Sequence, residues 1–299
     1  GWEIGVGLAT GGSDATSTND TWSDTSFFDT GDIRLDYAYA KHDFALGTAD
    51  LEVIAGQQKN PFLSSWVLWD SDVRPAGITL KAEAGGFFGT IGWYDVYNAG
   101  NEICSMAGAQ AGYGFKTEAI NGKVAAAYYS YEDSVWKDSD MNGDGFVDYG
   151  DSGFGFQIGD LYAEVGMPLG EKASVGLFAD YFKNFGATGG AGQGYQMDPS
   201  LDASSEDSGW IAGIGLKAGA FSLDYAYAVI AENAVIPYLM DADFGSGLNF
   251  TDVEGHRIKA GYKVTKNCSI SLMAQFAEAL EREGVGGVDL YQLDMSYKL

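Results

Sequence analysis

The last stretch of the chain alternates strictly between apolar and polar residues. From Tyr291 onward, every second residue is apolar or aromatic, through Leu293, Met295, Tyr297 and Leu299, and the residues between them are polar. Successive side chains of a strand point to opposite faces, so this alternation predicts a β-strand with one apolar and one polar face. A sheet of such strands must cover its apolar face with a second sheet or with lipid.

The same rhythm runs through the whole chain and predicts one large antiparallel β structure over residues 1–299. We expect about fourteen strands, each near the length of about 9–11 residues that crosses a bilayer in a barrel. Gly85-Gly86 and Asn121-Gly122 are typical of tight hairpin turns between such strands. A loop is expected around Cys104. No apolar run is long enough for a membrane-spanning helix.

Loop lengths separate a soluble sandwich from a membrane barrel. The predicted connections alternate between long and short without exception, which places all long loops at one rim. This is typical of a closed antiparallel transmembrane β-barrel with short periplasmic turns and long external loops. Tyr and Trp near the strand ends fit an aromatic girdle. The alternative, a soluble calcium-binding β-sandwich, predicts solubility without detergent.

The phase of the alternation predicts which side chains face the barrel interior. With the apolar faces toward lipid, Ile33, Leu35, Tyr37 and Tyr39 of the second strand face outward. The residues expected to line the interior are Arg34, Asp36, Glu52, Lys81, Glu83, Asp224, Arg257, Lys259, Lys263 and Asp294. Their mixed sign indicates a transverse field across water, whereas a phosphate-selective pore needs a stack of Arg and Lys.

Residues 57–75 form a predicted loop that is too apolar to lie in water, because it carries Phe62, Trp66 and Trp69. We expect it to fold into the interior or to pack against a neighbouring subunit. In the first case four charged residues would form a constriction: Lys59, Asp70, Asp72 and Arg74. A loop that only caps the rim is the alternative.

Residues 140–151 read D-x-N-x-D-G-x-V-D-x-x-D, which resembles an EF-hand or dockerin-type calcium loop without flanking helices. The side-chain ligands would be Asp140, Asn142, Asp144, Asp148 and Asp151. The carbonyl of Phe146 would complete the site, and Gly145 permits the sharp turn. The spacing predicts one Ca²⁺ ion here; a solvated acidic loop is the alternative.

The net charge of −25 argues against a nucleic-acid partner, because a phosphate-binding surface must be basic. Acidity of this size suits bound divalent cations or a pore that favours cations. His42 and His256 fall at strand ends or in the wall without a nucleophile nearby, so no enzyme is expected. Cys104 and Cys268 fall at opposite rims and are predicted to be free thiols.

Three stretches resemble a family of bacterial outer-membrane porins. They are Leu8–Asp20 (LATGGSDATSTND), Lys59–Phe62 (KNPF), and Trp69–Asp72 (WDSD) followed by Pro75–Ile78 (PAGI). The resemblance implies a location in the outer membrane of a Gram-negative bacterium and a homotrimer. It also implies an N-terminal hairpin and upstream segment that are missing here, and so about sixteen strands in the complete barrel, enough for an aqueous channel.

The expected function is passive diffusion of small hydrophilic solutes and ions through a water-filled pore, with a mild preference for cations. The alternative is a calcium-loaded surface protein, structural or adhesive, whose barrel conducts little.

Overall fold

The computed structural model describes residues 1–10, 33–99, 102–132, 155–187, 205–241, 243–245, 248, 251–282 and 284–298. Its strands are β1 (Trp2–Thr10), β2 (Ile33–Leu46), β3 (Ala49–Gln57), β4 (Ala76–Ala84), β5 (Phe87–Ala99), β6 (Glu102–Lys116), β7 (Asn121–Tyr131), β8 (Gln157–Pro168), β9 (Ala173–Asn184), β10 (Ser208–Ala218), β11 (Phe221–Ile230), β12 (Val253–Lys263), β13 (Cys268–Ala279) and β14 (Val288–Tyr297). A short 3₁₀-helix, η2, spans Pro237–Leu239. In this part of the chain no helix is long and apolar enough to cross a membrane, a finding about helices alone.

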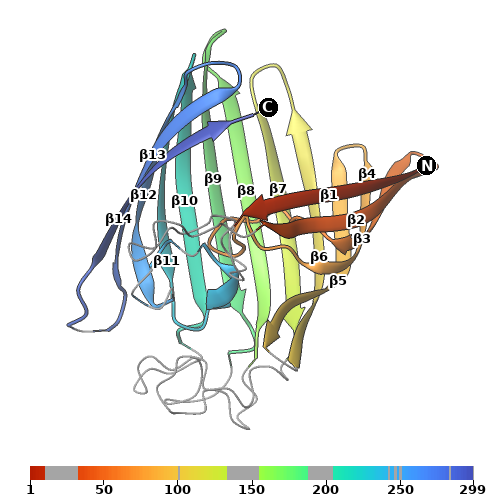
Figure 1. The fold of residues 1–299 in the computed structure, drawn as a ribbon, viewed down its shortest axis with the longest axis horizontal. Coiled ribbons are helices and arrows are strands. Elements are labelled where there is room, and N and C mark those ends of the chain that lie inside the picture. The colour runs from red at the N-terminus through yellow and green to blue at the C-terminus, as the bar shows by residue number, and fades with distance from the viewer. Residues whose placement is uncertain are drawn as a thin grey trace.

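All fourteen strands belong to one antiparallel sheet in which each strand pairs with its neighbours in sequence. Figure 1 shows this sheet curving round an interior, with β1 and β14 at its two edges. Among the described residues no ladder joins β1 to β14. The all-β antiparallel architecture with the predicted number of strands is confirmed.

The outer face of the sheet is apolar and exposed, as the alternation predicts. Leu293 is 75% exposed and Ile4 69% exposed, whereas Asp160 and Asp180, on the opposite face, are 2% and 1% exposed. An apolar surface this large is unfavourable in water, because removing it from water lowers the free energy by about 25 cal/mol per Å². The sheet therefore presents its apolar face to lipid and its polar face to the interior.

A β-bulge in β2 overturns part of the predicted facing. Gly7 pairs with Tyr37 but Leu8 pairs with Leu35, so Asp36 is an extra residue in the strand. Ile33 and Leu35 face outward as expected, but the extra residue inverts the phase beyond it. The prediction for Tyr37 and Tyr39 is therefore wrong: both face inward. Simple alternation cannot reveal such an insertion, because it assumes an uninterrupted period of two.

Two predicted connections also differ from the structure. The loop expected around Cys104 is wrong: β6 begins at Glu102 and pairs with β5, leaving only residues 100–101 between the strands. The loop rim therefore contains one short connection. The turn predicted at Asn121-Gly122 lies at residues 117–120 instead, because Asn121 and Gly122 are the first residues of β7 and pair with β6. The Thr117 hydroxyl accepts bonds from the amides of Ala119 (3.2 Å) and Ile120 (3.0 Å), which fixes the turn there.

Candidate pore and its lumen loop

Residues 58–75, between β3 and β4, lie inside the curved sheet, and we call them the lumen loop. The side chains of Val67, Leu68 and Trp69 are 0%, 2% and 3% exposed. They belong to a cluster of buried apolar side chains inside the sheet that also includes residues of the wall. The loop therefore fills interior space and does not merely cover the rim.

Phe62 anchors the lumen loop to the wall by aromatic contacts. Its ring meets Tyr129, Tyr94 and Trp69 edge-on, with centroids 5.1, 5.9 and 6.5 Å apart. Edge-to-face pairs of this kind each contribute about 0.5–1.5 kcal/mol beyond the area they bury. The ring is seated over Gly108 of β6, where a Cβ atom would lie 2.6 Å from Phe62 Cζ. Glycine at this position makes the seat possible.

Polar clamps fix the same loop at three points. The amide of Ser65 donates to Asp180 Oδ2 at 2.9 Å. Leu63 exchanges two bonds with the side chain of Gln110, at 2.8 and 2.7 Å. The amide of Asp70 donates to the carbonyl of Leu239 at 2.7 Å. Three different parts of the protein, β9, β6 and the segment containing η2, therefore hold one loop.

The segment between β11 and β12 supplies the other half of the interior packing. Val235, Met240 and Phe244 are fully buried, and the Phe244 ring meets Trp66 at 5.0 Å. We call the described apolar residues of this segment together with those of the lumen loop the interior plug. Strand alternation did not predict this contribution, although the apolar run from Ala234 to Met240 was a signal for it.

The predicted constriction residues do not all meet. Arg74 pairs with Asp36 at 2.9 Å and approaches Asp72 at 3.7 Å. Asp70 is 8% exposed, and its carboxylate accepts a 2.6 Å bond from the amide of Asp72. Lys59 is exposed and its ammonium lies 5.9 Å from the centroid of the Tyr37 ring. Arg74, Asp36 and Asp72 thus form one cluster, while Asp70 shapes the loop and Lys59 lies apart over Tyr37.

One side of the interior, formed by β1–β4, is rich in carboxylates, and we call it the acidic wall. The predicted residues Glu52, Lys81 and Glu83 face inward there. Lys41 binds Glu52, Glu3 and Asp43 at 3.2, 3.6 and 3.7 Å, and Lys81 binds Glu52 at 3.3 Å. Lys41 and Asp43 were missed because the bulge reverses the phase of β2. Arg34 also faces inward, before the bulge.

The opposite side, formed by β10–β12, carries Lys217, Arg257 and Lys259 on its inward face, and we call it the basic wall. The predicted residues Asp224 and Lys263 face inward with them, and Asp294 faces inward on β14. Arg257 pairs with Asp241 at 3.0 Å and stacks over the Trp66 ring at 4.6 Å. A cavity of about 750 Å³ lies between this wall and the lumen loop.

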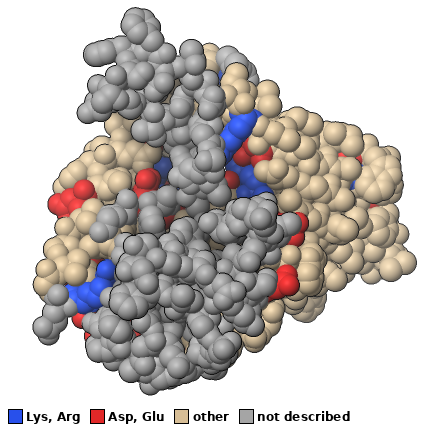
Figure 2. All heavy atoms as spheres, turned by 60° about the horizontal axis from the view of Figure 1, so that its bottom comes forward, with Lys and Arg blue, Asp and Glu red and all other residues tan. Residues whose placement is uncertain are grey.

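Basic and acidic side chains are intermixed where the molecule is viewed from the side of the long connections (Figure 2). Lys and Arg lie next to Asp and Glu on this face rather than in separate patches of one sign. The arrangement can orient a polar solute, and the residues described on this face form no stacked column of arginines for a polyanion.

A pair of buried carboxyl groups lies behind the lumen loop. The side chains of Asp160 and Asp180 come within hydrogen-bonding range of each other, and the hydroxyl of Tyr129 donates to Asp160 Oδ2 at 3.4 Å. One oxygen of each carboxyl group, Asp160 Oδ1 and Asp180 Oδ1, accepts no other bond in the described part of the chain. A single proton held between the two carboxyl groups would satisfy both oxygens.

The two histidines lie in the wall of the sheet. His42 faces outward, with its ring centroid 5.1 Å from that of Trp2, and His256 Nδ1 lies 2.9 Å from the hydroxyl of Tyr225. Cys268 is a free thiol. The calcium motif at 140–151 lies outside the described residues, as does the Cys104 side chain. Within the part that is described, no group of three or more His, Cys, Asp and Glu is placed to hold a metal ion.

Comparison with known proteins supports a porin. Residues 1–149 match the family model described as "Putative porin". OprB of Pseudomonas putida superposes with a TM-score of 0.54 at 14% identity, over 89% of this chain and 73% of that one. OpdL of Pseudomonas aeruginosa gives 0.52 at 14% identity, over 90% and 72%. No curated protein matches the sequence.

The matched segment contains the stretches in which the resemblance was found, Leu8–Asp20, Lys59–Phe62 and Trp69–Ile78. The solved structures share the antiparallel sheet, and an apolar outer face with a charged interior is the arrangement that a bilayer requires of a channel barrel. The N-terminal half of the chain, residues 1–149, thus matches the "Putative porin" family, and the sheet has the fold of solved outer-membrane porins.

Proposed function

We propose that the protein is a diffusion porin that passes small hydrophilic solutes and ions and mildly prefers cations. The observation that carries this proposal is the position of the lumen loop between the acidic wall and the basic wall. The loop narrows the interior, and cavities of about 540 and 750 Å³ border it. A solute in transit is therefore exposed to a field directed from one wall to the other.

Passive transport follows from this construction. The protein supplies a polar path through the bilayer, and the narrowest part of that path sets the limits on size and charge. A mild preference for cations is supported by the acidic wall, where carboxylates outnumber the basic residues Arg34, Lys41 and Lys81. Arg257 and Lys259 on the opposite wall oppose strong selectivity, because they admit anions along the other side.

Planar-bilayer recording tests this proposal. The purified protein in a KCl gradient is expected to give open steps and a reversal potential displaced modestly toward that of K⁺. Silence over many insertions would contradict it and would support the second candidate, a calcium-loaded structural or adhesive barrel that conducts little. That candidate is favoured by the interior plug, whose apolar residues fill part of the space a wide pore would need.

We also propose that the loop at 140–151 binds Ca²⁺. The support is the agreement of residue types at every ligand position, from Asp140 to Asp151. Calorimetry on the purified protein should show one site that is lost in Asp144→Ala. The absence of binding at millimolar calcium would contradict this assignment.

A homotrimer is the proposed assembly. Besides the family resemblance, its support is the grouping of short strands: β1, β3 and β4 have nine residues each, at the lower limit for crossing a bilayer. A wall of short strands gains most from being sheltered against a neighbouring copy. Native mass spectrometry in detergent measures the assembly, and a monomer under all detergents would contradict the proposal.

A further inference from the structure

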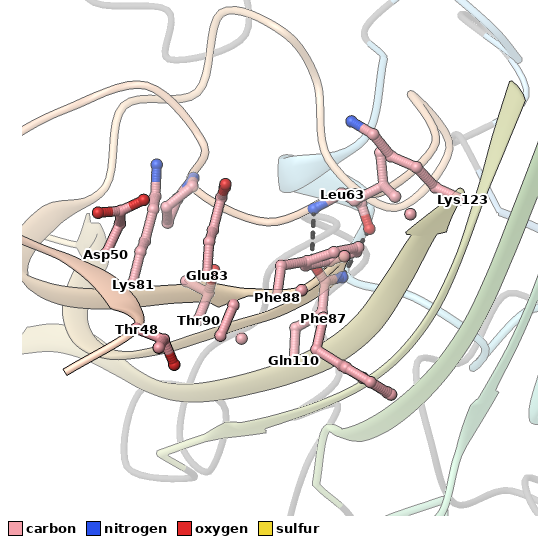
Figure 3. Close-up of a pocket in the computed structure, with 16 residues that line it drawn as sticks. Thr48, Asp50, Leu63, Lys81, Glu83, Phe87, Phe88, Thr90, Gln110 and Lys123 are labelled. Atoms are coloured by element: carbon pink, nitrogen blue, oxygen red, sulfur yellow. Dashed lines mark hydrogen bonds between the residues drawn. The ribbon is translucent and has the colours of Figure 1, made fainter. Parts of the chain in front are cut away.

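A pocket of about 540 Å³ lies between the lumen loop and the short turns at the other rim. Figure 3 shows its labelled residues: Asp50, Lys81 and Glu83 rise from one side, Lys123 comes from the other, and Phe88 lies between them. Pro61 and Leu63 of the lumen loop also line it. The pocket is thus bounded by the wall and by the loop that narrows the channel.

The pocket is held in shape before any solute arrives. Gln110 donates to the carbonyl of Leu63 at 2.7 Å and accepts from its amide at 2.8 Å, the two dashed bonds of Figure 3. The Phe88 ring is seated over Gly112, where a Cβ atom would overlap it. A preformed site loses little entropy when it binds, which favours recognition of a weakly held solute.

Asp50 and Glu83 form a pair of like charges that the protein leaves uncompensated. They are directly opposite each other on β3 and β4. Like charges in this relationship are destabilising. The adjacent acidic pair, Asp43 and Glu52, is bridged by Lys41. Among the described residues, however, no Lys or Arg forms an ion pair with Asp50 or Glu83, and Lys81 binds Glu52 instead. A cationic group of a bound solute would neutralise the repulsion between these two carboxylates.

Lys123 offers the opposite charge at the far side of the pocket. It pairs with Gly114 on β6 and faces inward. Glu83 lies on β4, three strand spacings from β7, which corresponds to about 14 Å between backbones. Inward-pointing side chains shorten the gap between the charged groups. Glu164 is directly opposite Lys123 on β8, but its carboxylate accepts a 3.0 Å bond from the Tyr162 hydroxyl. No ion pair of Lys123 forms in the described part of the structure, so its ammonium group can accept a carboxylate.

We propose that this pocket is a binding site for short zwitterionic peptides, and the proposal rests on the protein being a channel. The peptide's N-terminal ammonium binds Asp50 and Glu83 and lies near the Phe88 ring, which adds a cation–π attraction. The C-terminal carboxylate binds Lys123. Two or three extended residues span about 7–11 Å, so a dipeptide or tripeptide fits the gap, whereas the charges of a single amino acid are too close together.

Current block by trialanine in planar bilayers tests the assignment. Free trialanine is expected to reduce the KCl current with a half-saturating concentration about tenfold lower than N-acetyl-trialanine or trialanine amide, since each analogue loses one charged contact. Glycine should block no better than the analogues. Equal block by all three peptides, or by the free peptide and its amide, would overturn the proposal.

Glu83→Gln and Lys123→Gln should each abolish the preference for the free peptide, while both variants still give open steps in KCl. The matched controls are Glu171→Gln and Lys172→Gln in the exposed β8–β9 turn, which should retain the preference. A wild-type protein that conducts but does not distinguish the free peptide from its analogues contradicts this site alone. A protein that never conducts contradicts the proposed porin function, so the two failures are distinguishable.

Discussion

The amide of Ser65 donates a 2.9 Å hydrogen bond to Asp180 Oδ2, joining residues 115 positions apart in sequence. The bond connects the lumen loop to β9, and the accepting carboxyl group also contacts Asp160. The position of the loop is therefore coupled to a buried acid pair in the barrel wall. Four predictions concern such contacts.

Asp180→Ala should release the lumen loop. The substitution leaves the buried Ser65 amide without its acceptor, which costs about 1–3 kcal/mol. Hydrogen exchange at Ser65 should accelerate, and single-channel recordings should show added open-state noise. Asp180→Asn is the control, because its amide oxygen can still accept the bond. Unchanged exchange at Ser65 in Asp180→Ala would show that the bond does not hold the loop.

Gly108→Ala should unseat Phe62. The new Cβ atom would lie 2.6 Å from the ring, and overpacking of this kind costs about 1–3 kcal/mol. The protein should unfold at lower denaturant concentration and conduct more. Gly114→Ala on the same strand is the control, since its Cβ atom meets nothing nearer than 3.8 Å. If both variants behave alike, the seat over Gly108 is not specific.

Arg257 is expected to affect selectivity and loop position separately. Arg257→Met removes a positive charge from the basic wall, so the reversal potential should move further toward that of K⁺. Arg257→Lys keeps the charge but loses the planar stack on Trp66, 4.6 Å away. That variant should retain the original selectivity and show only a less stable loop. A shift of equal size in both variants would argue against an electrostatic role.

Asp243 should make the interior plug sensitive to pH. Burial raises the pKa of the Asp243 carboxyl group, and the nearby Asp241 adds to the shift; Arg257 opposes it and Asp294 supports it. Because the folded-state pKa is raised, the stabilising contribution is complete below the unfolded pKa and is lost as pH rises through the folded pKa. Channel noise should therefore increase as pH rises from about 4. Asp243→Asn should remove that dependence, and a profile identical to the wild type would contradict the prediction.

The strands could be predicted because their physical cause is local. Lipid on one side and a polar interior on the other impose the alternation that runs from Tyr291 to Tyr297, and a tight turn such as Gly85-Gly86 follows from positive φ angles of 58° and 90°. The apolar composition of residues 57–75 likewise predicted a loop that avoids water.

The interior contacts could not be predicted, because they depend on distant partners. Nothing near Ser65 in sequence indicates Asp180, and nothing near Trp66 indicates Arg257. The inward position of Lys41 was missed for a different reason: one extra residue, Asp36, reverses the facing of everything that follows it in β2. The short β5–β6 connection also could not be predicted, because pairing between the two strands extends both beyond what their composition indicates.

The bulge at Asp36 also determines how this strand can tolerate mutation. Removing that one residue would rotate Tyr39 and Lys41 toward the acyl chains and bring Phe44 and Leu46 into the aqueous path, so a single-codon deletion there amounts to a wholesale exchange of surfaces. Substitutions at Asp36 leave the count of residues intact and spare the arrangement. Natural variation at this position should therefore replace Asp36 with another residue but not delete it.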